Sequence, residues 1–510
     1  MQPAYSDIIA YNAAFFPDKA AVTIDERALS YRALAAQVAE VQRLLAPHVE
    51  AGDRVAIWLP NSFAWITTFL ALASLRAVSV PLNTRLTVAE VDVILRDCGA
   101  RVLVTTTHYR GRDYLDEAGS ADLSCAVTVA ASDDDAPGEW RLWANNRTRE
   151  EDEAGELNDL FCVQYTSGTT SKPKGVMLAE HKYLHTAAHC VRCQMLTPNS
   201  SFMSAAPFFH CSGSMHAITV CLLAGCTLHT MAAWDVERFL HLAQLYRGEV
   251  GHGVYLRDVV AYGTAKARPY LDTLKTVSAV GTPRELGALH NELGIKGIAN
   301  LYGMTETCGN ITMWFPDDPF DKRISANGRP QLGNHIRIVD PDTGTECVRG
   351  QAGEIQMKGL TVTSGYFRRP AANADAFTAD GWFKSGDLGS LSEEHELHYV
   401  ARLKEIVRVG GENVSPAEVE EVIRDVSGLK QVCALAVPHE RLGEVVAAVV
   451  IANDAVAWPD VMVQVKTRLA NFKVPREIYL AEVFPMTATN KVQRSLLQKQ
   501  IADGKFTRVA

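Results

Sequence analysis

In the first part of the chain, short apolar runs typical of buried strands alternate with longer segments typical of helices. Some of these longer segments are amphipathic, and others are apolar throughout. The runs expected to form strands are residues 54–59, 78–82 and 101–105. A first helix is expected to begin at Ser30, which is a typical cap residue. Two further helices are expected at residues 62–75 and 88–95. This alternation favours an α/β fold of mainly parallel sheets with covering helices. The acidic stretch 132–158 is predicted to be a surface connection into a further strand.

The pattern changes after Asp387. Polar residues 392–396 precede an alternating strand at residues 397–400. Beyond Lys404 the expected elements are a helix at 416–426, strands at 432–437 and 445–451, and a helix at 458–469. Pro416 is a typical first residue of a helix. A segment of about 100 residues is large enough to form a small α+β domain of its own.

Composition narrows the class of protein. A chain of 510 residues exceeds one ordinary core and is expected to divide into domains. Its 47% hydrophobic and 21% charged residues are typical of a soluble globular protein. The net charge of −9 argues against a nucleic-acid partner. The most apolar run, residues 64–75, is too short for a membrane span and ends at Arg76.

The eleven cysteines show no disulfide framework. Cys190 and Cys193 form a C-x-x-C pair without a second pair downstream, so a zinc site is disfavoured. The N-terminus has neither the basic region nor the apolar core of a signal peptide. A reduced, cytoplasmic protein is therefore expected.

The segment Y-T-S-G-T-T-S-K-P-K-G-V at residues 165–176 combines hydroxyls, glycines and lysines between two apolar runs. Gly168 and Gly175 would allow close approach of the backbone to an anion and positive φ. Lys172 and Lys174 add positive charge, and successive backbone N–H groups can form an anion-binding concavity. We predict a phosphate-binding loop, with a solvated polar loop as the simpler alternative.

Two better-known loops do not fit this segment. A Walker A motif would need glycine where Pro173 stands. Residues 171–174 match the S-x-x-K motif of penicillin-binding enzymes, but the chain has no K-T-G element.

Further motifs follow in a fixed order. They are P-F-F-H-C-S-G at 207–213, N-L-Y-G-M-T-E-T at 300–307, G-W-F-K-S-G-D at 381–387, R-L-K-E at 402–405, G-G-E-N-V-S-P at 410–416 and P-M-T-A-T-N-K at 485–491. Together with the loop they resemble the adenylate-forming superfamily of acyl-CoA synthetases, luciferases and adenylation domains. The resemblance implies a nucleotide- and acyl-binding domain at residues 1–403 and a mobile C-terminal domain at 404–510. Lys404 would be the hinge.

The activity implied by this resemblance is that of an AMP-forming acid–CoA ligase. A carboxylate would attack the α-phosphate of ATP, giving an acyl-adenylate and pyrophosphate. The thiol of coenzyme A would then displace AMP and form a thioester. Two anions meet in the first step, so aligned donors, lysine and Mg²⁺ are needed to neutralise charge.

The resemblance assigns the phosphate side of ATP to a group of small, hydroxyl and basic residues: Thr166, Ser167, Gly168, Thr169, Thr170 and Lys174. Glu306 would hold Mg²⁺, because this hard ion takes carboxylate oxygens beside phosphates. Thr305 would face the α-phosphate. The alternative is that Glu306 is only a carboxylate at a helix N-terminus, with Thr305 as the cap.

The nucleoside side is assigned in the same way. The residues expected near adenine are Gly281, Thr282, Tyr302 and Gly303. Asp387 and Arg402 would bind the ribose. Core burial is the alternative for Tyr302, and turn capping is the alternative for Asp387. For Arg402 it is a surface ion pair with Glu405 or another nearby acid.

Residues for the acyl group and the thiol complete the set. Lys491 resembles the lysine that bridges the substrate carboxylate and the α-phosphate, and the Gly410–Gly411 loop would form the pantetheine tunnel. His210 would line the acyl pocket, although histidine among aromatics is more often a core residue. The other expected pocket residues are Phe209, Gly251, Gly253 and Gly309, whose glycines suggest room for a bulky acid.

Several positions depart from the family pattern, mostly on the ATP side. They are Ser171, Ser385, Asn490 and an abbreviated segment at 279–284. An enzyme that mainly performs the thioester step on a supplied adenylate is therefore an alternative. Others are a ligase that loads a carrier protein's pantetheine, a nucleotide-binding protein without catalysis and, more remotely, a luciferase-like oxidase.

Overall fold

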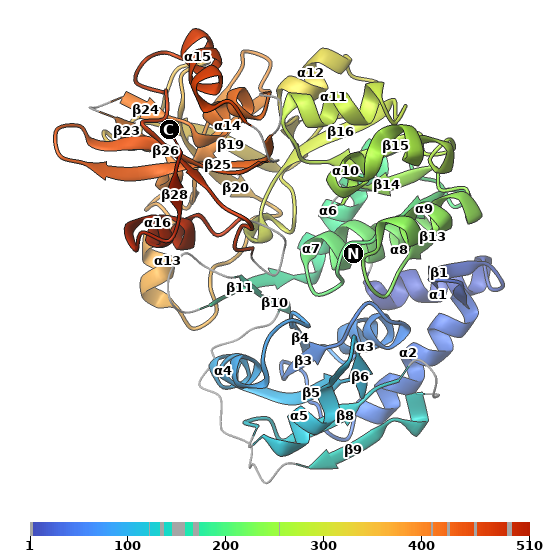
Figure 1. Cartoon of the computed structure of the whole chain (residues 1–510). Helices are drawn as coiled ribbons and strands as arrows, with labels where there is room; N and C mark the ends of the chain where they lie inside the picture. Colours follow the sequence, from blue (N-terminus) through green and yellow to red (C-terminus); the bar gives the residue numbers. More distant parts are fainter. Residues whose placement is uncertain are drawn as a thin grey trace. The chain divides into compact units, whose positions relative to one another are not determined.

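The computed structural model describes residues 4–121, 123–132, 137–144, 159–166, 173–253, 255–409, 412–425, 429–452, 456–486 and 492–509. The chain forms two compact units (Figure 1). The first consists of Met1–Ile336, Met357–Phe383 and Glu394–Leu397, and the second of Arg337–Gln356, Lys384–Glu393 and His398–Ala510. The predicted hinge residue, Lys404, belongs to the second unit.

One large sheet of the first unit runs in the order β18-β17-β16-β15-β14-β12-β13-β1-β2. Its central strands, from β16 to β1, pair in parallel, and its edges are antiparallel. The strands are β1 (Ala20–Ile24), β2 (Arg27–Ser30), β12 (Ser201–Met203), β13 (Thr227–Thr230), β14 (Val250–His252), β15 (Thr276–Ala279), β16 (Gly297–Tyr302), β17 (Thr312–Met313) and β18 (Arg329–Pro330). Both β15 and β16 are buried along their whole length, as expected of strands covered on two faces.

A second sheet of this unit has the order β11-β10-β4-β3-β5-β8-β9. Its interior is parallel, whereas β11 and β9 pair antiparallel at the two edges. The strands are β3 (Arg54–Trp58), β4 (Val78–Pro81), β5 (Ala100–Thr105), β8 (Val127–Ala130), β9 (Arg141–Ala144), β10 (Leu160–Thr166) and β11 (Lys174–Ala179). The α/β class with mainly parallel sheets is therefore confirmed.

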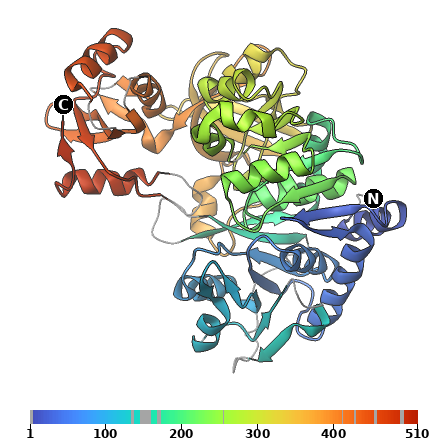
Figure 2. The same ribbon diagram turned by 45° about the vertical axis from the view of Figure 1, so that its right-hand side comes forward.

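Helices follow the strands as the apolar spacing predicts. They include α1 (Tyr5–Phe15), α2 (Tyr31–Leu45), α3 (Phe63–Ser74) and α4 (Val88–Cys98). The side chains of Ser30 and Ser62 accept the Ala33 and Trp65 N–H groups and so cap α2 and α3. Helices α1 and α2 are adjacent, and both are blue in Figure 2. No helix among the described residues is long and apolar enough to cross a bilayer.

The predicted surface connection at residues 132–158 is only partly correct. Part of it, Arg141–Ala144, forms β9, which pairs antiparallel with β8 at the edge of the sheet. The side chains of β9 are exposed or half-buried, so the strand lacks the apolar signal of the central strands. Backbone pairing, which composition does not reveal, places it in the sheet.

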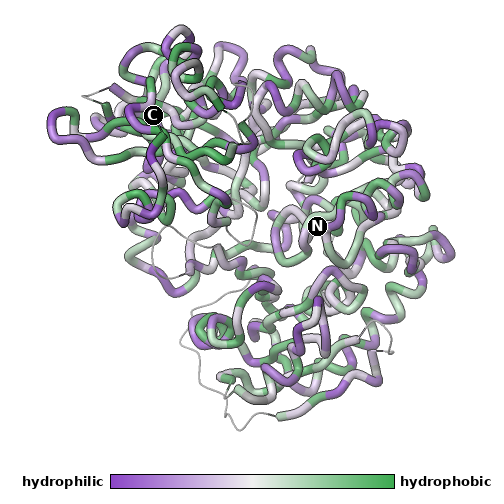
Figure 3. The backbone as a smooth tube through the Cα atoms, viewed as in Figure 1, coloured by the Kyte–Doolittle hydropathy of each residue, from purple (hydrophilic) through white to green (hydrophobic). Residues whose placement is uncertain are grey.

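In the second unit one sheet has the order β24-β23-β26-β27-β28, with β25 also paired to β26. Its strands are β23 (Val407–Val409), β24 (Glu412–Val414), β25 (Leu429–His439), β26 (Gly443–Ala452), β27 (Glu477–Leu480) and β28 (Thr507–Arg508). The helices of this part are α14 (Pro416–Arg424), α15 (Trp458–Arg468) and α16 (Arg494–Ala502). Hydrophobic residues, green in Figure 3, follow β25 and β26 and form the core of this part.

Another sheet, β19-β20-β21-β22, has most of its residues in the second unit. It consists of β19 (Asn334–Val339), β20 (Gly353–Gly359), β21 (Phe383–Leu391) and β22 (Leu397–Arg402). The alternating pattern that predicts a strand at residues 397–400 is confirmed by β22. The predicted elements beyond Lys404 are confirmed by α14, β25, β26 and α15.

An aromatic cluster supports β10, the strand that leads into the predicted phosphate loop. The ring of Phe69, from α3, lies edge-on to Phe161 of β10 at 4.9 Å between centroids. Tyr5 stacks on Phe161 at 5.2 Å, and Trp65 stacks on Phe69 at 4.9 Å. Phe69 has no solvent-exposed surface. Close packing of this kind makes the cluster sensitive to loss of volume.

We expect Phe69→Ala to lower the free energy of unfolding of the first unit by about 3–5 kcal/mol, because the cavity lies in a packed core. Urea unfolding followed by tryptophan fluorescence measures this, since Trp458 is the one tryptophan of the second unit. The matched control is Phe15→Ala, whose ring is 65% exposed and which should change stability little. Equal losses in both variants would contradict the proposed importance of the cluster.

Candidate active site

The strands β10 and β11 form a hairpin that brings the two ends of the predicted loop together. Thr166 and Lys174 are opposite one another in the antiparallel register. The Thr166 hydroxyl donates to the Lys174 carbonyl at 3.4 Å. The predicted phosphate contacts Ser167, Gly168, Thr169 and Thr170 lie outside the described residues.

Glycine is needed at position 175, but not for the positive φ that the sequence suggested. It lies within β11, and its φ is not positive. A Cβ there would stand 2.5 Å from Val163 Cγ1 and 3.1 Å from Tyr165 Cζ. The glycine is required because the neighbouring strand packs against it, and not for a left-handed turn.

Tyr366 brings Lys174 and Glu306 to one place. Its hydroxyl donates to Glu306 Oε1 at 2.9 Å, and Lys174 Nζ lies over its ring at 4.9 Å from the centroid. Among the described residues, no group forms a hydrogen bond with Glu306 Oε2. In that part of the chain, no carboxylate pairs with Lys174 either. Glu306 is half-buried; a carboxylate oxygen suits a divalent cation, and an ammonium group suits a phosphate.

Glu306 lies in a single 3-10 turn, η4 (Thr305–Thr307). The alternative in which Thr305 caps a helix is not correct. Met304 is the capping residue, and its N–H donates to Thr307 Oγ1 at 3.0 Å. Thr305 is buried within the turn, which ends at Cys308 in the left-handed conformation. A turn this short leaves Glu306 without the helix dipole invoked in that alternative.

Tyr302 and Gly303 end the central strand β16. Tyr302 is 6% exposed, and its N–H donates to Thr312 Oγ1 at 3.2 Å. A Cβ at Gly303 would come within 2.2 Å of the Asn310 Cα atom, so no side chain fits there. This close approach folds the segment after Glu306 back beside the strand end.

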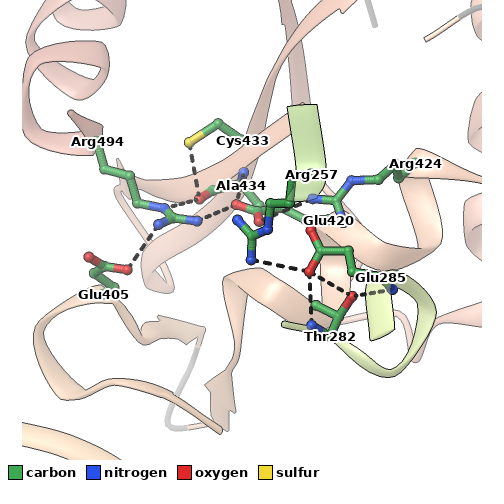
Figure 4. A network of polar contacts seen from close by, with 9 residues as sticks. All are labelled: Arg257, Thr282, Glu285, Glu405, Glu420, Arg424, Cys433, Ala434 and Arg494. Carbon is green, nitrogen blue, oxygen red and sulfur yellow. Dashed lines mark hydrogen bonds and ion pairs between the residues drawn. The ribbon is translucent and has the colours of Figure 1, made fainter. Parts of the chain in front are cut away.

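On the predicted adenine side, Thr282 caps helix α11 (Pro283–Asn291). Its hydroxyl accepts the Glu285 N–H at 3.3 Å, and its own N–H donates to Glu285 Oε2 at 2.8 Å (Figure 4). Arg257 pairs with the same carboxylate at 3.2 Å. Gly281 precedes this capping box, and a Cβ there would meet Glu285 Oε2 at 3.2 Å. The observed role of Thr282 is therefore that of a helix cap.

In the second unit, Asp387 and Arg402 meet across β21 and β22. Arg402 Nε lies 3.0 Å from Asp387 Oδ1, and Asp387 is 3% exposed. Asp387 is thus a buried strand residue, so turn capping does not describe it. The partner of Arg402 is Asp387, whereas Glu405 pairs with Arg494. Burial, together with the Asp387 carboxylate, raises the pKa of the nearby Tyr399 phenol.

Arg494 ties together several elements of the second unit. It pairs with Glu405 at 3.1 Å and also with Glu420 of α14 (Figure 4). Its Nε donates to the Ala434 carbonyl of β25 at 3.3 Å. Lys404 is exposed in the turn Leu403–Glu405. The predicted residues Gly410, Gly411 and Lys491 lie outside the described residues.

His210 lies at the start of a helical segment after β12. Its Nδ1 accepts the Ser212 N–H at 3.2 Å, which leaves the Nε2 atom to carry the proton of the neutral ring. His210 and the adjacent Phe209 are both half-buried. The chain then enters a π-helical turn, η2 (Ser214–Thr219), an irregularity that is frequent at functional sites.

His216, in that turn, stacks on His252 of β14. The two rings are nearly parallel, 6° apart, with centroids separated by 4.7 Å. Burial lowers the pKa of His216 well below its usual range, and the neighbouring His252 and His210 lower it further. Burial lowers the pKa of His252 to about 4. Both rings are therefore neutral near pH 7.

The glycines of the predicted acyl pocket are surrounded by protein. A Cβ at Gly251 would meet the Met203 carbonyl at 3.0 Å, and one at Gly253 would meet Ala279 Cβ at 3.1 Å. Gly309 has a φ of +104°, and a Cβ there would stand 2.7 Å from His216 Nε2. Neighbouring atoms occupy these spaces, so the glycines do not by themselves create room for a bulky acid.

Sequence reasoning missed Gln164 and Tyr366. Gln164 is 3% exposed in β10, and its amide donates to the Phe209 carbonyl, which fixes the segment before His210. A buried amide inside an otherwise apolar strand is a signal that could have found it. Tyr366 lies 60 residues from Glu306 and carries no comparable local signal.

Comparisons with known proteins give matches over most of the chain. Residues 9–367 match the family model described as AMP-binding enzyme, and residues 418–491 match its C-terminal domain. A Mycobacterium tuberculosis 3-[(3aS,4S,7aS)-7a-methyl-1,5-dioxo-octahydro-1H-inden-4-yl]propanoyl:CoA ligase is 32% identical, with 95% of this chain and 96% of the relative covered.

Two solved structures share the fold over almost the whole chain. ATP-bound MatB from Rhodopseudomonas palustris has a TM-score of 0.85 at 26% identity, with 98% of this chain and 99% of that chain covered. The o-succinylbenzoate CoA synthetase MenE from Bacillus subtilis, in complex with the acyl-adenylate OSB-AMP, has a TM-score of 0.83 at 26% identity. The comparison covers 98% of both chains.

The buried neutral His216 makes stability depend on pH. Its pKa is lower in the folded than in the unfolded chain, so below about pH 6.5 the unfolded state binds more protons. This residue therefore removes up to about 1.4 kcal/mol of stability per pH unit as the pH falls below that value. We expect His216→Gln to show a shallower loss than the wild type between pH 6.5 and 5.5. Urea unfolding at several pH values measures this. If the free energy of unfolding fell equally steeply with pH in both proteins, His216 would not be the buried neutral group inferred here.

Proposed function

The chain belongs to the family of AMP-binding enzymes, and from this premise we propose that it is an AMP-forming acid–CoA ligase. It would convert a carboxylic acid and ATP into an acyl-adenylate and pyrophosphate, and then transfer the acyl group to the thiol of coenzyme A with release of AMP. The observation that carries this proposal is the meeting of Lys174 and Glu306 on Tyr366, beside the two ends of the predicted phosphate loop.

We assign the triphosphate of ATP to this place. Lys174 would contact phosphate oxygens, with Thr166 and the loop residues Ser167, Gly168, Thr169 and Thr170 as further donors. Glu306 would hold Mg²⁺, which would neutralise phosphate charge when bound. Thr305 would lie next to the α-phosphate. An ammonium group and a carboxylate oxygen without other partners among the described residues support these roles.

We assign the nucleoside of ATP to the residues expected near adenine and near the ribose. Tyr302, Gly303, Gly281 and Thr282 would lie on the adenine side. Asp387 and Arg402 would bind the ribose hydroxyls. Support for the ribose role comes from the ion pair that holds the buried Asp387 carboxylate beside Arg402, because a carboxylate has two oxygens that can accept the two ribose hydroxyls.

The C-terminal residues would serve both half-reactions. We propose that Lys491 acts in adenylation and that Gly410 and Gly411 line the path of pantetheine. The domains would then be residues 1–403 and 404–510, with Lys404 as the hinge. The exposure of Lys404 in a short turn supports a hinge, because little packing opposes a change of its dihedral angles.

We propose that the acyl group lies near Phe209, His210, Gly251, Gly253 and Gly309. The neutral rings of His216 and His252 nearby make this region able to form hydrogen bonds without a fixed charge. Free coenzyme A is the preferred acceptor, because the chain's net charge of −9 would repel an acidic carrier protein. The eleven cysteines are all free, which supports a reducing compartment such as the cytoplasm.

ATP–pyrophosphate exchange over a panel of carboxylic acids, followed by detection of the CoA thioester, tests the proposal. We expect at least one acid to support both steps. Exchange without thioester would point to a carrier protein or an oxidative partner, and thioester formation only from a supplied adenylate would point to a half-reaction enzyme. Failure of both half-reactions across a panel spanning aliphatic, aromatic and polycyclic acids would contradict the ligase assignment.

Substitutions at the proposed hinge and at the proposed adenylation lysine should impair different half-reactions. Lys404→Pro restricts the dihedral change, so we expect it to retain ATP–pyrophosphate exchange but to lose most thioester formation. Lys491→Ala should lose exchange by about a hundredfold or more, while retaining thioester formation from a supplied acyl-adenylate. Both half-reactions are measured in both variants. Equal loss of the two activities in Lys404→Pro would rule out the hinge assignment.

A further inference from the structure

The segment 363–367 contacts both the turn of Glu306 and the strand of Lys174. The Thr363 N–H donates to the Glu306 carbonyl at 2.7 Å, and the Thr363 hydroxyl donates to the Met177 carbonyl at 2.7 Å. Tyr366 forms an antiparallel bridge with Val176. One short segment thus fixes two elements that are more than a hundred residues apart in the chain.

The side chain of Tyr366 then connects the two charged groups themselves. Its hydroxyl binds one carboxylate oxygen of Glu306, and its ring faces the Lys174 ammonium. Tyr366 is 9% exposed, whereas Lys174 and Glu306 are half-buried, so the tyrosine holds two charged groups that a ligand can still reach. The bond also leaves Glu306 Oε2 without a competing partner among the described residues.

The backbone of Tyr366 is held independently of its hydroxyl. Asn373, from helix α13 (Pro370–Ala376), accepts the Tyr366 N–H through Oδ1 at 2.6 Å and donates through Nδ2 to the Tyr366 carbonyl at 3.0 Å. The bridge to Val176 adds a second anchor. Removal of the hydroxyl therefore leaves the segment in place and changes mainly the orientation of Glu306.

From this arrangement we infer that Tyr366 is a positioning residue that sets the Glu306 carboxylate for Mg²⁺ and the Lys174 ammonium for phosphate in one fixed geometry. The inference rests on the proposed function. The two parts of the side chain have separable tasks, since the hydroxyl orients Glu306 and the ring orients Lys174.

Two substitutions separate these tasks. Tyr366→Phe removes the hydrogen bond to Glu306 and keeps the ring under Lys174. We expect the Mg²⁺ concentration for half-maximal ATP–pyrophosphate exchange to rise about tenfold, the usual scale for a hydrogen bond to a charged group, with an unchanged KM for the acid. Tyr366→Leu removes the ring as well and should also weaken binding of ATP without metal.

Calorimetric titration provides a readout that does not depend on turnover. Tyr366→Phe should bind Mg²⁺–ATP more weakly than the wild type, but metal-free ATP equally well. The matched control is Tyr5→Phe, which removes another buried hydroxyl of the same unit, bonded to Thr219 Oγ1 at 2.6 Å. It should alter stability without altering the Mg²⁺ dependence.

A double-variant cycle identifies the route of the effect. If Tyr366 acts through Glu306, Glu306→Gln combined with Tyr366→Phe should be no more defective than Glu306→Gln alone. Additive defects, or an unchanged Mg²⁺ dependence in Tyr366→Phe alongside normal wild-type exchange, would overturn this inference and leave the ligase function standing. Absence of ATP binding by the wild type would instead overturn the proposed function, and this inference with it.

Discussion

The antiparallel pairing of β10 with β11 is the constraint on which the candidate site depends. It places Thr166 opposite Lys174, so the strand ends on either side of the predicted phosphate loop lie side by side. On its other side β10 pairs in parallel with β4, which ties the hairpin to the interior of the sheet. The aromatic packing of Phe161 against Phe69 and Tyr5 adds the buried area that stabilises this strand.

Next to this hairpin, Tyr366 contacts the two charged groups of the candidate site, Lys174 and Glu306. A lysine and a glutamate that approach each other freely would form an ion pair and neutralise one another. Here a tyrosine stands between them, with its ring toward Lys174 and its hydroxyl toward Glu306. Both charges remain available for opposite charges on a ligand. This is the arrangement expected of a site that must accept a metal and a phosphate together.

Burial affects other polar groups of the chain in two ways. The stacked rings of His216 and His252 are held neutral because charging them would cost desolvation energy. Asp387 is also buried, and it forms an ion pair with the Arg402 guanidinium at 3.0 Å. Buried polar groups are thus accommodated as neutral rings at the two histidines and as an ion pair at Asp387.

The order of strands and helices could be read from the sequence because local periodicity depends on neighbours a few residues apart. The cap at Ser30 and the buried helix after Ser62 were predicted on that basis and are confirmed. The exposed strand β9 was missed because an edge strand has little apolar signal. The predicted roles of Lys491, Gly410 and Gly411 stay predictions, because these residues lie outside the described part of the chain.

The sequence by itself determined the α/β class, the family and the residue types that can handle phosphate, metal and ribose. Only the tertiary structure decided which of them meet. It paired Arg402 with Asp387 and not with Glu405, and it placed Tyr366 between Lys174 and Glu306. The reason is physical: such contacts depend on strand register and on the path of the connecting segments. Those are set by packing between residues far apart in the chain, which no local pattern encodes.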